Sequence, residues 1–166
     1  MNVIIKSTLK TLNQTKSLLS SLEDDVLSNS SVSPYYSSIG SHVRHILDFY
    51  DCIFSINTEN KIDLTARSRN IDVESKCTSA EDYLDSIINK LKNFDFDDNR
   101  LVNVIDDLGS GKIQIPYTFG ALFAQANSHT IHHYAIINYI ANSLKITLSN
   151  TDFGYNPTTP KQVSVD

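Results

Sequence analysis

Apolar residues recur every three or four positions in four long stretches of the chain, which is the spacing of amphipathic helices. The first stretch covers residues 3–28. A loop rich in Ser then leads to Pro34, a residue that disfavours helical backbone at the position before it. The second stretch starts with Ser37 or Ser38 as its N-cap and runs to about residue 57. The first third of the chain is therefore predicted to form two helices.

Two further helical patterns lie in the second half of the chain. Residues 58–78 precede them and have mixed charge without a sustained period, so we expect irregular structure there. Ser79 is predicted to open the third helix, with Asp82 three residues later as a variant of the capping box. The fourth helix, which is the longest, is predicted over residues 117–144.

Two short β-prone runs separate the third and fourth helices. They cover residues 101–105 and 112–117, and the segment between them contains Gly109 and Gly111. Glycine allows the positive φ that tight hairpin turns require. The pattern therefore predicts a β-hairpin at this point of the chain.

Together these elements predict an all-α fold, namely a four-helix bundle with a long connection and a small β-hairpin before the last helix. We expect residues 1–150 to form the bundle. Residues 151–166 contain Pro157 and Pro160 and are predicted to be an irregular tail.

Composition narrows the classes of partner. The chain of 166 residues has a net charge of −5 and no run of Lys or Arg, so we expect it not to bind nucleic acid. No stretch has the apolar length of a signal sequence or a membrane-spanning helix, so a cytoplasmic protein that does not enter a membrane is expected. Cys52 and Cys77 are then expected to be reduced thiols.

The histidines are the main candidates for chemistry. The chain has five, which form one cluster of two and one of three: His42, His45, His129, His132 and His133. His129 and His133 are four residues apart and are placed by a helical wheel at the centre of an apolar face. Two imidazoles at this spacing point the same way and can chelate one metal ion. The alternative is a pair of core histidines that hydrogen-bond across the bundle.

The choice of a third ligand is open on the residues alone. At 100° per residue, His42 lies about 30° from the centre of the apolar arc of its helix and His45 about 90° away. The wheel therefore favours His42. His132 falls off the apolar face of the last helix and is expected at its edge or in solvent.

The two histidine clusters, in residues 38–50 and 128–137, resemble those of the DinB superfamily, also called YfiT-like metalloenzymes. The resemblance covers most of the chain, from about residue 5 to residue 145. It implies a four-helix bundle with a three-histidine site, one ligand from the second helix and two from the fourth. In that pattern the ligand on the second helix precedes two aliphatic residues, as His45 precedes Ile46 and Leu47. The resemblance thus implies His45, His129 and His133 as ligands, with His42 as a supporting or substitute group.

A three-histidine site suggests a class of function. Three neutral imidazoles leave a coordination position open for water or substrate, which is typical of a catalytic site. Nickel and zinc are the expected ions, and iron and manganese also suit such ligands. Because relatives in that superfamily include transferases that use low-molecular-weight thiols, we expect thiol transfer or metal-assisted hydrolysis of a small molecule. The alternative is a catalytically silent metal-binding or stress-response bundle, and a homodimer is compatible with either function.

Other residues have a structural interpretation and a functional one. Arg44 and Asp48 are four residues apart and are expected to form a surface pair. Arg67 and Arg69 could bind an anionic substrate, although such residues are usually solvated. Cys52 could take a redox or ligand role, but a buried structural thiol is the expected one. Tyr50 and Tyr134 could line the pocket, although a tyrosine in a helical stripe usually belongs to the core.

Overall fold

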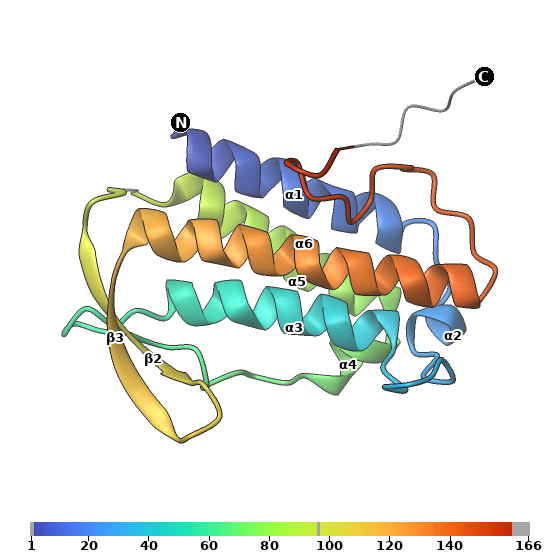
Figure 1. The fold of residues 1–166 in the computed structure, drawn as a ribbon, viewed down its shortest axis with the longest axis horizontal. Coiled ribbons are helices and arrows are strands. Elements are labelled where there is room, and N and C mark those ends of the chain that lie inside the picture. The colour runs from blue at the N-terminus through green and yellow to red at the C-terminus, as the bar shows by residue number, and fades with distance from the viewer. Residues whose placement is uncertain (1, 96, 161–166) are drawn as a thin grey trace.

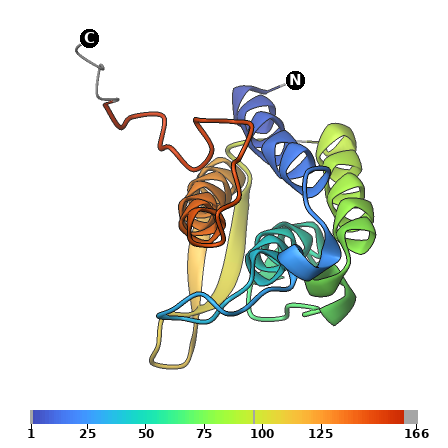
Figure 2. The ribbon, with the colours of Figure 1, turned by 90° about the vertical axis from the view of Figure 1, so that its right-hand side faces the viewer.

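Four long helices make up most of the structure, a computed structural model that describes residues 2–95 and 97–160 (Figure 1). In chain order they are α1 (Val3–Leu19), α3 (Ile39–Phe54), α5 (Cys77–Asn93) and α6 (Phe119–Ser143). α1 packs against α5 and α6, and α3 packs against the same two helices, so the four surround a common core. Figure 2 shows this arrangement nearly end-on. The core between them includes Leu12, Leu47, Leu84 and Phe123, each with no exposed surface.

The predicted first helix is two helices. α1 ends at Leu19, and a short helix, α2 (Asp24–Leu27), follows after a break. At the break, the hydroxyls of Ser20 and Ser21 donate hydrogen bonds to the carbonyls of Ser17 and Leu18. Such local bonds compete with helical backbone bonding. The helix therefore ends here although the apolar spacing of the sequence continues.

The start of α5 is set by a distant residue. The helix begins at Cys77, so the prediction that Ser79 opens it with Asp82 in a capping box is wrong. Instead, the backbone N–H of Cys77 donates to the Asp24 carboxylate of α2 at 2.8 Å. A carboxylate at a helix N-terminus supplies the acceptor that the first turn lacks. α3, by contrast, starts as predicted, because the Ser38 hydroxyl accepts a hydrogen bond from the Ser41 N–H.

A small sheet lies at one end of the helices, so the fold is mostly helical but not all-α. The predicted hairpin is confirmed as β2 (Leu101–Asp107) and β3 (Lys112–Thr118), which pair antiparallel. Gly109 and Gly111 in its turn both have a φ of +99°. The segment predicted as irregular contains two further elements, β1 (Lys61–Asp63), which pairs parallel with β2, and a short helix, α4 (Ile71–Ser75).

α6 is the longest helix and closely matches its prediction. Thr118 caps it, since its hydroxyl accepts a hydrogen bond from the Ala121 N–H. Within the part of the chain that the structure describes, no helix has both the length and the apolar character needed to cross a membrane.

Gly40 allows α3 and α4 to pack closely because it has no side chain. A Cβ atom added to Gly40 of α3 would lie 2.0 Å from the carbonyl oxygen of Glu74, in α4. Glycine therefore allows the backbones of α3 and α4 to approach each other.

The segment after α6 runs back along the bundle without helix or strand up to residue 160 (Figure 1). Phe153 is buried there and stacks on Tyr134 of α6, with ring centroids 4.4 Å apart. The predicted division at residue 150 stays a prediction, and residues 161–166 of the predicted tail lie outside the described residues.

Candidate metal centre

Three histidines from two helices converge on one point. One ring nitrogen from each of His45, His129 and His133 lies within 4.8 Å of the others. The His45 and His129 Nε2 atoms are 2.9 Å apart, and the His129 and His133 Nε2 atoms are 3.2 Å apart. The structure therefore brings together the three residues that the resemblance implied, and they lie close enough to bind a metal ion.

These separations match those of ligands around a single ion. Imidazole nitrogens about 2.0–2.1 Å from a tetrahedral ion lie roughly 3.3–3.4 Å from one another. The His45–His129 and His129–His133 separations are only slightly shorter than this. An ion could therefore be accommodated by a small outward movement of the rings, without rearrangement of α3 or α6.

The site lies at the edge of the core, not at the centre of the apolar face of α6. Thr130 and Tyr134 occupy the centre, with 1% of each exposed. His133 is 9% exposed and His129 is half-buried, as is His45. The prediction that His129 and His133 lie at the centre is wrong, because the predicted face left out Thr130 and Tyr134, which are buried. At this edge position, His45 and His129 each keep part of their surface exposed.

His42, which the helical wheel favoured, lies behind the triad. Its Nδ1 is 2.8 Å from His133 Nδ1, on the side of that ring away from the three Nε2 atoms. Its Nε2 is 2.9 Å from the Ser37 hydroxyl. His42 therefore supports His133 in the way that outer hydrogen-bond partners orient metal-binding imidazoles.

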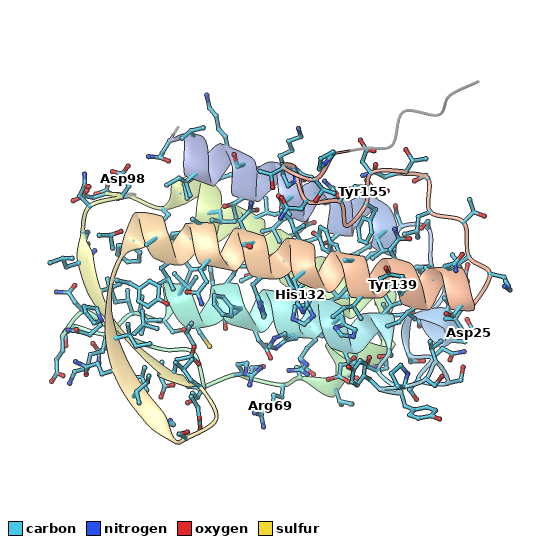
Figure 3. The ribbon with its side chains drawn as sticks, viewed as in Figure 1. Asp25, Arg69, Asp98, His132, Tyr139 and Tyr155 are labelled. Atoms are coloured by element: carbon cyan, nitrogen blue, oxygen red, sulfur yellow. The ribbon has the colours of Figure 1, made fainter. Side chains whose placement is uncertain are left out.

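His132 is exposed, as predicted, and lies beside α6 on the outside of the bundle (Figure 3). Its ring centroid is 5.3 Å from that of His133, with the planes inclined at 68°. It is not one of the three histidines whose nitrogens converge.

Burial keeps the converging imidazoles neutral. Burial, together with the neighbouring rings of His129, His45 and His42, lowers the pKa of His133 to about 2. Burial is also the main cause that lowers the pKa of His45 to about 4, with His129 and Arg67 adding to it. Because a metal ion binds the neutral ring, these histidines are in the ligand form at pH 7.

Arg67 contacts the site directly. Its Nη1 lies 2.7 Å from His45 Nδ1, on the side of the ring opposite the triad. Arginine has only donors, so His45 Nδ1 accepts this hydrogen bond and carries no proton. In the neutral ring the proton is then on Nε2, which faces His129.

The remaining protons follow from the same hydrogen-bond pattern, from which we assign them. His45 Nε2–H donates to His129 Nε2, and His133 Nε2–H points to the same atom. His133 Nδ1 then accepts from His42 Nδ1–H. The Ser37 hydroxyl completes the chain by donating to His42 Nε2. Without an ion, both ring nitrogens of His42 and of His45 have matched partners, whereas the single lone pair of His129 Nε2 faces two N–H groups.

A buried carboxylate fixes the segment that carries Arg67. Asp48 is 1% exposed and accepts hydrogen bonds from Arg44 Nη1 at 2.9 Å and from the Tyr83 hydroxyl at 3.1 Å. It also accepts a bond from the backbone N–H of Arg69. Arg44 bonds Glu74 as well, at 2.8 Å. The expectation of a surface pair between Arg44 and Asp48 is therefore wrong, because α4 and α5 cover it.

The other candidate side chains have structural surroundings. Tyr50 and Tyr134 are buried core residues, as the usual interpretation of a helical stripe predicts. Cys52 and Cys77 are free thiols. Burial is the main cause that raises the pKa of each to about 11, which keeps both protonated at pH 7. A thiol in that state is a poor nucleophile and metal ligand.

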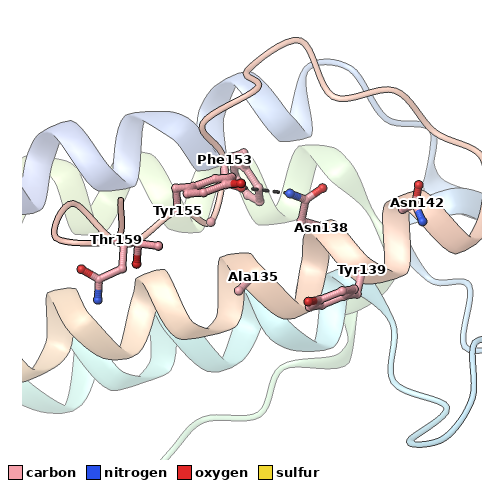
Figure 4. Close-up of a pocket in the computed structure, with 9 residues that line it drawn as sticks. Ala135, Asn138, Tyr139, Asn142, Phe153, Tyr155 and Thr159 are labelled. Carbon is pink, nitrogen blue, oxygen red and sulfur yellow. Dashed lines mark hydrogen bonds between the residues drawn. The ribbon is translucent and has the colours of Figure 1, made fainter. Parts of the chain in front are cut away.

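A pocket of about 490 Å³ lies elsewhere, between α6 and the C-terminal segment (Figure 4). The Asn138 side-chain amide donates there to the carbonyl of Phe153 at 3.1 Å. Among the described residues that line it there is no His, Cys, Asp, Glu, Lys or Arg. The chemistry-bearing groups of the chain are therefore gathered at the histidines and not in this pocket.

Sequence reasoning did not place three neighbours of the site, although it named Arg67 as a possible anion-binding residue. Phe49 packs on the His129 ring at a centroid distance of 5.0 Å, Ser37 bonds His42, and Arg67 bonds His45. Phe49 carried a signal, since it stands four residues after His45 on the same helix. The position of Arg67 depends on the path of a connection that has no period.

Comparisons with protein-family models, with curated proteins and with solved structures found no match to this chain. The relation to the DinB superfamily therefore stays a prediction, and the histidine geometry carries the functional argument.

Proposed function

We propose that this protein is a metal-dependent enzyme that acts on a small molecule, with one divalent transition-metal ion held by His45, His129 and His133. One observation carries the proposal, which is the convergence of three Nε2 atoms at separations of 2.9 and 3.2 Å. Two of the ligands come from successive turns of α6 and the third from α3. A site built on two packed helices holds its ligands in place before an ion arrives.

The ligand set favours catalysis over a purely structural ion. Structural zinc sites are usually closed by four protein ligands, whereas catalytic ones keep a position for water or substrate. Here the protein offers three histidines, and two of them, His45 and His129, are only half-buried. A substrate could therefore reach the fourth position.

An ion at this site would supply Lewis-acid activation of a water molecule or a thiol. The histidines would hold it as neutral ligands, and Phe49 would cover one side with an apolar ring. Both cysteines of the chain are protonated at pH 7, so a thiol that reacts would come from the substrate. These features support thiol transfer from a low-molecular-weight thiol, with hydrolysis as the second reaction.

We assign the fold to a four-helix bundle of the DinB type, on the sequence resemblance and on the two-helix origin of the ligands. The proposed ion is nickel or zinc, both of which suit three imidazoles, and iron and manganese are compatible with the same ligands.

A second candidate function is a catalytically silent metal-binding bundle. It is favoured by the hydrogen-bond chain from Ser37 through the histidines to Arg67, which stabilises the site without an ion. In that function, an ion would mainly add stability to the fold.

The test is elemental analysis of protein purified without a histidine tag. The wild type should contain about one equivalent of a transition metal, and His45→Ala and His133→Ala should lose it. His42→Ala should keep an ion, because His42 does not face the triad. No metal in the wild type after reconstitution with zinc and nickel would contradict the proposal.

Chelation then separates the two functions. If the ion is catalytic, chelated protein should lose turnover in a screen of thiol transfer and hydrolysis and recover it on reloading. If the ion is structural, chelation should lower the melting temperature, and the loaded protein should show no turnover.

A further inference from the structure

We propose that Arg67 is the substrate-recognition group of the metal centre and that it binds a carboxylate of the small-molecule substrate. This inference rests on the proposed metal site. It assigns a substrate class that the three histidines alone do not indicate.

The first step of the argument is the state of Arg67 in the structure. Its guanidinium is half-buried and bonds a neutral imidazole at 2.7 Å. Within residues 2–95 and 97–160 it forms no ion pair. Its Nε atom is buried and has no hydrogen-bond partner there. A partly desolvated cation without an anion is costly, so the group is short of a partner.

A comparison with Arg44 shows that this shortage is specific. Arg44 is 14% exposed and pairs with both Asp48 and Glu74. The fold therefore supplies carboxylates to one buried arginine on this side of the bundle and withholds them from the other. The natural partner of the second is an anion from outside the chain.

The second step concerns the proton on His45. To bind an ion through Nε2, the neutral His45 ring must carry its proton on Nδ1. Nδ1–H and the Arg67 guanidinium are both donors, so they cannot remain at 2.7 Å. Arg67 must then leave His45 when the ion binds. The guanidinium is then freed beside the His45 ring, on its Nδ1 side.

The third step is the balance of charge. A divalent ion on three neutral imidazoles keeps its two positive charges, and the freed guanidinium adds a third. A carboxylate can bond a guanidinium through two parallel N–H groups, which is the strongest form of this contact. A substrate with a carboxylate close to its reactive group would therefore be oriented by Arg67 while that group reaches the ion.

The test uses full-length protein loaded with Co²⁺, whose visible absorption bands report ligand changes. Acetate is the probe, and neutral acetamide of similar shape is its control. Three proteins are titrated: the wild type, Arg67→Met and Arg69→Met. Arg69 lies in the same segment, but its side chain is exposed and points away from the helices (Figure 3), so its substitution is the matched control.

Acetate should perturb the bands of the wild type and of Arg69→Met with the same Kd, and acetamide should not. In Arg67→Met the Kd should rise at least about tenfold, while Co²⁺ binds as tightly as in the wild type or more tightly. If Arg67→Met does not fold, Arg67→Lys should still raise the Kd several-fold, because lysine lacks the paired donors.

Equal acetate affinity in the wild type and Arg67→Met would overturn the inference and leave the metal site intact. Loss of Co²⁺ from Arg67→Met alone would also overturn it, since Arg67 would then support the ligands. A wild type that takes up no Co²⁺ would overturn the metal site itself, and this inference with it.

Discussion

The carboxylate of Asp48, on α3, accepts a hydrogen bond from the backbone N–H of Arg69 at 3.2 Å. This bond joins the helix that carries His45 to the segment that carries Arg67, two residues before Arg69. Asp48 therefore sets the distance between a proposed metal ligand and the cation beside it. It does so from within the core, where water cannot replace it.

Removal of that carboxylate should destabilise the protein strongly. Asp48→Ala leaves Arg44 without one of its two partners and frees the segment around Arg69, and such losses cost about 3–5 kcal/mol. Urea unfolding measures the change. Asp85→Ala is the control, since it breaks an exposed pair with Lys16 that is worth about 0–1 kcal/mol. Similar losses in the two variants would contradict a special role for Asp48.

His42 should tune the metal site without being a ligand. Its Nδ1 holds the His133 ring in place. Substitution of such an outer partner typically lowers metal affinity about 10–100-fold. We expect that loss for His42→Ala in a competition titration against a metal chelator. His132→Ala should bind as the wild type does, because His132 is exposed; a complete loss of binding in His42→Ala would make His42 a ligand.

The metal-free protein should lose stability in mild acid. The folded pKa of His45 is about 4 and that of His133 about 2, both below the usual 6.5. The unfolded chain therefore binds more protons. The contribution of the two histidines to the free energy of unfolding is complete above pH 6.5 and falls as the pH drops toward 4. Because water screens half-buried rings, the loss by pH 5 should be on the order of 1–2 kcal/mol.

The control for that acid loss replaces His45 by a polar side chain that cannot be charged. Urea unfolding at pH 7 and pH 5 should show a smaller difference for His45→Asn than for the wild type. His132→Gln should keep the wild-type difference. An unchanged difference in His45→Asn would show that carboxylates alone cause the acid loss.

Gly40→Ala should destabilise the protein although alanine favours helices. The gain in helix propensity is about 1 kcal/mol. Against it, the new Cβ would lie 2.0 Å from the Glu74 carbonyl oxygen, which is backbone and cannot rotate away. Overpacking of this kind costs about 1–3 kcal/mol or more, so the melting temperature should fall. A rise would show that α4 can move away from α3 freely.

Periodicity predicted the elements that are long enough to show it. α3, α6 and the hairpin have caps and turns within a few residues of the expected positions, because Ser38, Thr118 and Gly109 act locally. β1 and α4 have three and five residues, too few for a period to be visible. The start of α5 depends on Asp24, which lies 53 residues earlier in the chain, and no local pattern contains that information.

The same distinction applies to the site. The spacing of His129 and His133 predicted a chelating pair, since both lie on one helix. The third histidine depends on how α3 packs against α6, and the helical wheel favoured His42 for its closeness to the apolar arc. In the structure, His45 lies at the margin of the apolar arc of α3 and faces His129, whereas His42 lies behind His133.

The hydrogen-bonded series from Ser37 through the histidines to Arg67 has two different ends. They respond differently when a ring proton moves from one nitrogen of a histidine to the other. At one end, Ser37 can donate or accept, so His42 and His133 can both reverse their tautomers and keep their bonds. At the other end, Arg67 can only donate and must move. Ion uptake above pH 6.5 then relocates protons within the rings, and none has to leave the three histidines. The three histidines themselves would therefore add no pH dependence to ion uptake across the neutral range.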